Sequence, residues 1–126
     1  MLKFLLAILG ATPNTCGDDL PRIVIGCWQV LEHHNSEAHA VETLQAYADA
    51  GFTAFDTADI YGRSESILGA LKNQGVEPII HTKYVTSSSS LAEAQRINAQ
   101  SQKALGVVPD LVAFHCARPT LGIPTL

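Results

Sequence analysis

The sequence predicts an α/β fold of about four parallel βα units, which is part of a (β/α)8 TIM barrel. Short apolar runs alternate with segments of helical periodicity, as expected for a parallel sheet covered by helices. The ends of these runs recur about every 30 residues, the length of one βα unit. Polar residues follow the runs, and none is followed by a glycine-rich phosphate loop, so a barrel is favoured over a dinucleotide-binding fold.

Four short apolar runs predict the strands. The first is a β-branched run closed by Gly26, and the second lies between Gly51 and Asp56. The third and the fourth are followed by basic residues, Lys83 and His115. The runs are apolar almost throughout, which is typical of parallel strands with both faces covered. The predicted strands are residues 22–25, 52–55, 79–82 and 111–114.

Three segments between these strands predict helices. Ser36 and Ser90 can each cap a first turn, and Glu93 completes a capping-box pattern after Ser90. The middle helix is predicted to begin at Ser64. Each helix is followed by a glycine, the residue that best adopts the left-handed conformation just past a helix end. These glycines are Gly51, Gly75 and Gly106.

The composition predicts one domain and excludes some classes of partner. The chain has 126 residues, of which 47% are hydrophobic and 16% are charged. Its net charge of −4 gives no reason to expect nucleic acid or a membrane as a partner. The three cysteines, Cys16, Cys27 and Cys116, show neither zinc-type spacing nor a disulfide framework. We interpret them as free thiols, which favours a reducing compartment such as the cytoplasm.

Residues 1–20 are predicted to form a leader and a turn-rich loop. Lys3 and the apolar residues after it resemble a very short targeting segment. The apolar run is far shorter than the roughly 20 residues that span a bilayer. A strand or a buried leader turn is the alternative interpretation of this segment.

Four polar residues lie near the carboxyl ends of consecutive predicted strands. Asp56 follows the second strand, and Tyr61 lies five residues later. Lys83 and His115 follow the third and the fourth strands. Because active sites of (β/α)8 barrels form at this end of the sheet, the four residues predict a proton-transfer site. The alternative is structural: Asp56 could cap a turn and Tyr61 could pack on the barrel rim.

Four motifs in this order resemble those of the aldo-keto reductase family. The longest starts at Gly51-Phe52, continues through Asp56-Thr57-Ala58 and Tyr61, and ends in a Glu-x-x-Leu-Gly pattern at residues 65–69. The resemblance covers residues 21–116 and implies the N-terminal half of the family's barrel. The other three motifs are Gly26-Cys27-Trp28-Gln29, His81-Thr82-Lys83 and Val112-Ala113-Phe114-His115.

The resemblance implies a mechanism in which NADPH reduces a small aldehyde or ketone to an alcohol. Tyr61 would protonate the carbonyl oxygen, a reaction that a nearby cation assists by favouring the phenolate. Lys83 would supply that cation, and Asp56 would hold its ammonium in place. His115 would hydrogen-bond the substrate oxygen and orient the carbonyl.

The same resemblance implies which residues contact the cofactor, NADP(H). Asp56 belongs to this set, and Gly26 would allow close backbone approach. Trp28 would line the nicotinamide or substrate pocket. Cys27 stands where the family usually has threonine, so a hydroxyl hydrogen bond near the nicotinamide is expected to be lost.

A metal site is not expected. Glu32, His33, His34 and His39 are close in sequence, but no second group of ligands has a recognisable spacing. We interpret this segment as a solvated loop.

The length of the chain shapes the functional expectation. A barrel of this type needs eight strands and about 250 residues, so we expect a truncated barrel, with an atypical tail at residues 117–126. The resemblance implies that later units hold the cofactor phosphates, so weak NADPH binding is expected. The alternatives are a non-enzymatic, partner-binding protein resembling potassium-channel β subunits, and self-association through exposed strand edges, including two copies that close one barrel.

Overall fold

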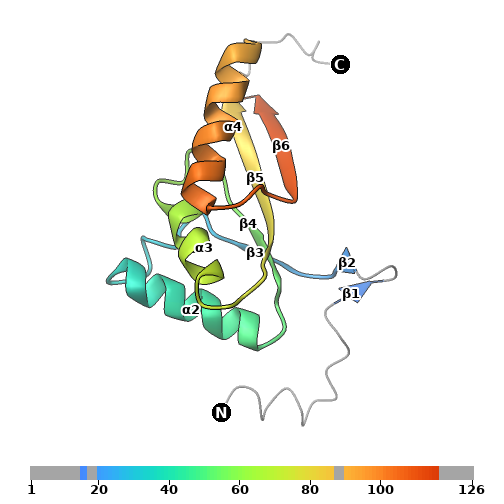
Figure 1. Cartoon of the computed structure of the whole chain (residues 1–126). Coiled ribbons are helices and arrows are strands. Elements are labelled where there is room, and N and C mark those ends of the chain that lie inside the picture. Colours follow the sequence, from blue (N-terminus) through green and yellow to red (C-terminus); the bar gives the residue numbers. More distant parts are fainter. Residues whose placement is uncertain (1–14, 17–19, 87–89, 117–126) are drawn as a thin grey trace, which may run out of the picture.

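The computed structural model describes residues 15–16, 20–86 and 90–116. Within this part, four parallel strands form one sheet in the order β3-β4-β5-β6, and three helices connect them (Figure 1). This arrangement confirms the predicted α/β fold of four parallel βα units. The elements are β3 (Val24–Gly26), α2 (Glu37–Asp49), β4 (Ala54–Asp56), α3 (Ser64–Lys72), β5 (Ile79–Thr86), α4 (Leu91–Leu105) and β6 (Leu111–Cys116).

The N-terminal segment contains a structure that the sequence did not predict. Strand β1 (Thr15–Cys16) pairs antiparallel with β2 (Leu20–Pro21), where we expected a loop. The predicted targeting segment and the predicted tail at 117–126 lie outside the described residues. In the described part of the chain, no helix has both the length and the apolar character needed to cross a bilayer.

The helix ends follow the predicted local signals. Ser36 Oγ accepts a hydrogen bond from the backbone N–H of His39 at 3.2 Å, and Ser90 Oγ accepts one from Glu93 at 3.4 Å. Both serines therefore cap their helices, as predicted. Helix α3 begins at Ser64, also as predicted. The glycines beyond the helices have positive φ angles of 93° at Gly51, 85° at Gly75 and 68° at Gly106.

The strand boundaries differ from the predicted ones. Strands β3 and β4 start two residues later than expected, because their pairing begins at Val24 opposite Ala54. Strands β5 and β6 are longer than expected, because residues 81–86 pair with residues 111–116. Lys83 and His115 therefore lie inside strands and not after them. Asp56 is the last residue of β4, whereas we had placed it just beyond the strand.

The helices cover one face of the sheet, and the core lies between them and the strands (Figure 1). Strand β5 shows this directly, because its residues alternate between buried and partly exposed. The prediction that both strand faces are covered is therefore wrong for the described part of β5. The partly exposed face of β5 carries Lys83. Large side chains with less than 2% exposure include Phe55, Ile67, Leu68, Leu71, Ile80 and Leu105.

Gly69 lets α3 pack closely on the end of α4. A Cβ atom at this position would lie 2.7 Å from the carbonyl oxygen of Ala104 and 2.9 Å from that of Leu105. Both neighbours are backbone atoms, which cannot move aside as a flexible side chain can. The contact between these two helices therefore depends on the missing side chain.

We expect Gly69→Ala to lower the free energy of unfolding by up to about 2 kcal/mol. Overpacking costs about 1–3 kcal/mol, and the better helix propensity of alanine returns about 1 kcal/mol. Urea unfolding followed by circular dichroism measures the change. Gly26→Ala is the control, since an added Cβ there meets no described atom within 4 Å. Equal losses in the two variants would contradict the packing argument.

Candidate active site

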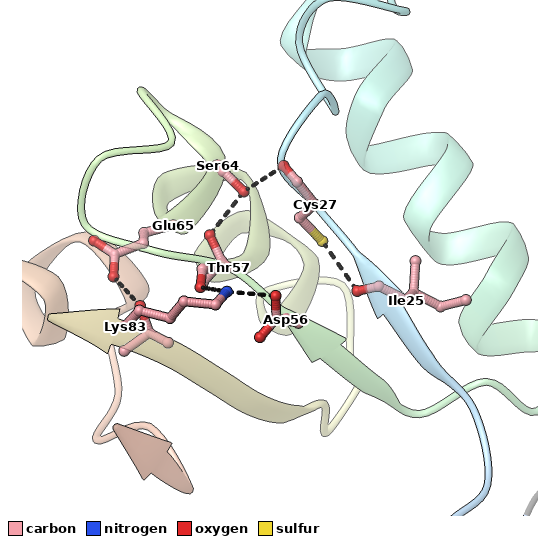
Figure 2. Close-up of polar contacts among 8 residues, drawn as sticks. Ile25, Cys27, Asp56, Thr57, Ser64, Glu65 and Lys83 are labelled. Atoms are coloured by element: carbon pink, nitrogen blue, oxygen red, sulfur yellow. Dashed lines mark hydrogen bonds and ion pairs between the residues drawn. The ribbon is translucent and has the colours of Figure 1, made fainter. Parts of the chain in front are cut away.

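An ion pair between neighbouring strands forms the centre of the candidate site. Lys83 Nζ donates to Asp56 Oδ2 at 2.5 Å and to the carbonyl oxygen of Thr57 at 2.9 Å (Figure 2). The register pairs Asp56 with His81, two residues before Lys83, so both charged side chains lie on the same face of the sheet. The side chain of Lys83 is 21% exposed and that of Asp56 is 37% exposed. The ammonium is thus held by two acceptors but stays accessible.

The loop between β4 and α3 brings Tyr61 to this ion pair. Lys83 Nζ lies 4.9 Å from the centroid of the Tyr61 ring. A cation at this distance interacts favourably with the ring and would stabilise negative charge developing on the phenolic oxygen. The indole ring of Trp28, from the loop after β3, lies 6.5 Å from the Tyr61 ring. The cluster therefore combines residues from the loops after β3 and β4 with Lys83 from within β5.

Asp59 holds this loop against β5, a role that the sequence analysis missed. Its backbone N–H donates to the carbonyl oxygen of Lys83 at 3.2 Å, and its Oδ1 accepts from the N–H of Val85 at 3.1 Å. The loop thereby continues the hydrogen bonding of β5 beyond the end of β4. An aspartate two residues before Tyr61, in a turn segment, was the available signal.

His115 lies apart from the other three predicted catalytic residues. It pairs with Val85 in the ladder, which puts it on the same face as Lys83 but two residues farther along the sheet. Its side chain is exposed. The structure thus brings Asp56, Tyr61 and Lys83 together, and the role of His115 stays a prediction.

The predicted cofactor residues differ in exposure. Gly26 is exposed at the end of β3, opposite Asp56, and Trp28 is 66% exposed. The Cys27 side chain is fully buried, and its thiol lies 3.7 Å from the carbonyl oxygen of Ile25 (Figure 2). Its backbone N–H donates to the carbonyl oxygen of Asp56 at 2.8 Å. Cys27 is therefore a core residue in the structure, and its place among the cofactor-binding residues stays a prediction.

Two pairs of buried hydroxyl and carboxyl groups surround the site and were not singled out from the sequence. Thr57 Oγ1 donates to Ser64 Oγ at 2.9 Å, and Ser64 Oγ donates to the carbonyl oxygen of Cys27 at 3.0 Å. Thr82 Oγ1 donates to Glu65 Oε1 at 2.7 Å. Figure 2 shows the bonds of Ser64 with Thr57 and with Cys27 above the ion pair. The sequence signal was present in the Asp-Thr-Ala and Ser-Glu segments.

One histidine of the segment after β3 is bonded to the protein and is not fully solvated. His34 Nδ1 contacts the carbonyl oxygen of Val30, and its Nε2 lies 2.9 Å from Thr43 Oγ1 on α2. His34 is half-buried and fastens this segment to the helix, which corrects the expectation for this residue. Among the described residues, no group of three or more histidine, cysteine, aspartate or glutamate side chains could hold a metal ion.

Comparison with known proteins decides the family. The aldo/keto reductase family model matches residues 22–125. The chain belongs to the aldo/keto reductase family. This confirms the resemblance found in the sequence motifs, and the match continues beyond residue 116, where we had ended the family segment. No curated protein matches the chain.

Solved structures of aldo-keto reductases have the same fold. A putative aldo-keto reductase from Pseudomonas aeruginosa has a TM-score of 0.71 and 27% identity, over 83% of this chain and 45% of that one. A thermostable aldo-keto reductase, solved with the inhibitor epalrestat, has a TM-score of 0.72 and 21% identity, over 89% of this chain and 44% of that one. An aldo-keto reductase of the silkworm, Bombyx mori, has a TM-score of 0.57 and 26% identity, over 72% of this chain and 31% of that one. The chain therefore spans less than half the length of these aldo-keto reductases.

We expect the burial of Cys27 to make the protein less stable at high pH. Burial, together with the nearby Asp56 charge, raises the pKa of the Cys27 thiol from 9.0 to about 12, although Lys83 lowers it. The stability from this group is complete below pH 9 and is lost as the pH rises towards 12, because only the unfolded chain then ionises readily. The loss is at most about 1.4 kcal/mol per pH unit.

Urea unfolding between pH 8 and pH 11, with Cys16→Ser and Cys116→Ser as the common background, measures this effect. Adding Cys27→Ala should make the stability fall less steeply above pH 9. Identical pH dependence with and without the Cys27 thiol would show that it does not contribute.

Proposed function

We propose that this chain carries the proton-donating part of an NADPH-dependent reductase that converts an aldehyde or ketone to an alcohol. The observation that supports this most directly is the position of the Lys83 ammonium, which bonds Asp56 and lies 4.9 Å from the Tyr61 ring. A tyrosine next to a fixed cation can donate a proton and keep the resulting negative charge stabilised. Family membership and the structural relatives support the same class of reaction.

The residues around Gly26 fit the nicotinamide end of NADP(H). The last residue of β3 has no side chain, is exposed and lies opposite Asp56 in the sheet. The exposed indole of Trp28 offers a flat apolar surface beside Tyr61. A planar ring placed over Gly26 would thus be close to the Asp56–Lys83–Tyr61 cluster. When bound, the cofactor supplies a hydride to the carbonyl carbon.

The chain's own residues would supply the other half of the reaction. The phenolic O–H of Tyr61 donates its proton to the carbonyl oxygen as the carbon receives the hydride, which yields the alcohol. Lys83 stabilises the phenolate that remains, and Asp56 fixes the lysine. His115, which lies on the same sheet face, would hydrogen-bond the carbonyl oxygen and orient the substrate. The buried free thiol of Cys27 favours a reducing compartment, and we infer a cytoplasmic location.

We expect Tyr61→Phe to reduce carbonyl-dependent NADPH oxidation by about 10²–10⁴-fold, the usual contribution of a general acid. Lys83→Met should cause a loss of similar size, since it removes the cation. Tyr47→Phe and Lys103→Met are matched controls, because Tyr47 and Lys103 lie exposed on α2 and α4. Absorbance of NADPH in the presence of a panel of aldehydes and ketones measures the rates. An active Tyr61→Phe variant would exclude the proposed acid.

A second candidate function is partner binding without catalysis, with a second copy of the chain as the partner. In the described part, β6 is hydrogen-bonded only to β5, and its large apolar residues Leu111, Val112 and Phe114 are 51%, 42% and 67% exposed. A strand of this kind favours pairing with another strand. A dimer in size-exclusion chromatography without carbonyl-dependent NADPH oxidation would support this function over the reductase.

We expect the 126-residue chain by itself to bind NADPH weakly. The family resemblance implies that further βα units hold the cofactor phosphates, and the chain spans only 45% of its Pseudomonas relative. The nicotinamide end alone lacks that binding energy. Titration of NADPH fluorescence measures the dissociation constant, which should be in the millimolar range. Micromolar binding that Gly26→Ala weakens would contradict this expectation and place a complete cofactor site on this chain.

A further inference from the structure

We propose that Thr57 and Ser64 are positioning residues: their hydroxyl groups set the place of Tyr61 and Trp28 relative to Lys83. The catalytic consequence of this inference rests on the proposed reductase function, whereas the positional part does not. The inference comes from a buried chain of hydrogen bonds that the reaction itself does not use.

The chain of hydrogen bonds has one direction. The carbonyl oxygen of Cys27 can only accept, so the single hydroxyl proton of Ser64 points to it at 3.0 Å. Ser64 Oγ must then accept the bond from Thr57 Oγ1, at 2.9 Å. Ser64 and Thr57 are both fully buried. Water does not reach these groups to replace a missing partner, and each unpaired group would be costly.

Each residue in this chain of hydrogen bonds is also connected to a part of the candidate site. The carbonyl oxygen of Thr57 accepts a hydrogen bond from Lys83 Nζ at 2.9 Å. The backbone N–H of Ser64 donates to the carbonyl oxygen of Tyr61 at 3.1 Å. Cys27 immediately precedes Trp28 in the sequence. The two hydroxyls therefore connect the segments that carry the cation, the proposed acid and the indole.

The first turn of α3 is bonded to three consecutive strand segments. Ser64 bonds Cys27 after β3 and Thr57 after β4, and the next residue, Glu65, accepts from Thr82 Oγ1 in β5 at 2.7 Å. Figure 2 shows the bonds between Ser64 and both Cys27 and Thr57, and the separate bond of Glu65. Since Tyr61 lies three residues before Ser64, the place of its ring depends on how this turn is seated. Packing alone would not require polar side chains here, because an apolar core of the same shape avoids buried polar groups.

The test compares Thr57→Val with Thr57→Ser. Valine keeps the shape of threonine and removes the hydroxyl, whereas serine keeps the hydroxyl and removes a methyl group. If the hydroxyl positions the site, serine resembles the wild type and valine does not. If Thr57 only fills space, the order is reversed. The two variants thus separate hydrogen bonding from packing.

The positional measurement uses NMR on the 126-residue chain. Trp28 is the only tryptophan of the sequence, so its indole N–H gives one resolved signal. With ring centroids 6.5 Å apart, nuclear Overhauser effects between the Trp28 and Tyr61 rings are expected in the wild type. We expect Thr57→Val to lose them and Thr57→Ser to keep them. Tyr61→Phe with its changed ring signals confirms the assignment.

The kinetic measurement is the rate of carbonyl-dependent NADPH oxidation. Thr57→Val should lower kcat about 10- to 100-fold with a smaller change in KM, since a displacement of about 1 Å can cost about 100-fold. Thr57→Ser should retain kcat. Retention of the ring contacts in Thr57→Val, or their loss in Thr57→Ser, overturns the inference. If the valine variant does not fold, the serine variant decides by the same criterion.

Failure of this inference is distinguishable from failure of the proposed function. A wild-type chain without carbonyl-dependent NADPH oxidation counts against the reductase, and the ring contacts in the two variants still decide the positioning role. Ser64→Ala, alone and combined with Thr57→Val, adds a double-mutant cycle. In urea unfolding, Ser64→Ala should cost less free energy once Thr57 is valine, since no buried hydroxyl is then left unpaired. If the effects of the two substitutions simply add, the two hydroxyls are not coupled, which would contradict a connected chain of hydrogen bonds.

Discussion

The register of β4 against β5 is the constraint on which the candidate site depends. Because Asp56 lies opposite His81, the side chain of Lys83 starts one pleat farther along the same face and reaches back to the carboxylate. A slip of one residue would turn Lys83 to the helix-covered face, where a lone charge is costly. The hydrophobic residues that alternate with it, Ile80 and Tyr84, hold the register by being buried under the helices. The same register therefore buries the core residues of β5 and places Lys83 next to Asp56.

The parts of the structure that follow from short sequence signals were predictable. Ser36 and Ser90 cap helices, and Gly51 and Gly106 follow helix ends, because the interactions involved reach only a few residues along the chain. The length of β5 was not predictable in this way. Its second half is a strand because β6, about 30 residues later, pairs with it, and no local pattern around Lys83 carries that information. Lys83 was placed after the strand in the prediction, whereas it lies inside β5 in the structure.

The candidate site shows the same division between local and long-range causes. Motif order pointed to Asp56, Tyr61 and Lys83, and these three do meet in the structure. The burial of Cys27 could not be inferred, because it depends on core residues that are far away in the sequence. The Cys27 thiol fills space in the core. The carbonyl oxygen of the same residue accepts its hydrogen bond from the hydroxyl of Ser64. Polar groups far apart in sequence satisfy one another only after the sheet has formed.

The exposed and the buried faces of β5 set different demands on the protein. On the buried face, Thr82 needs the carboxylate of Glu65, because an unpaired group there would lose its hydrogen bond to water without replacement. On the open face, the ammonium of Lys83 keeps 21% of its side-chain surface exposed, so its charge is only partly desolvated while Asp56 neutralises it. An accessible charge of this kind remains able to act on a molecule that approaches Tyr61. The helix-covered side of the sheet therefore carries the core, and the open side keeps the charged groups available for chemistry.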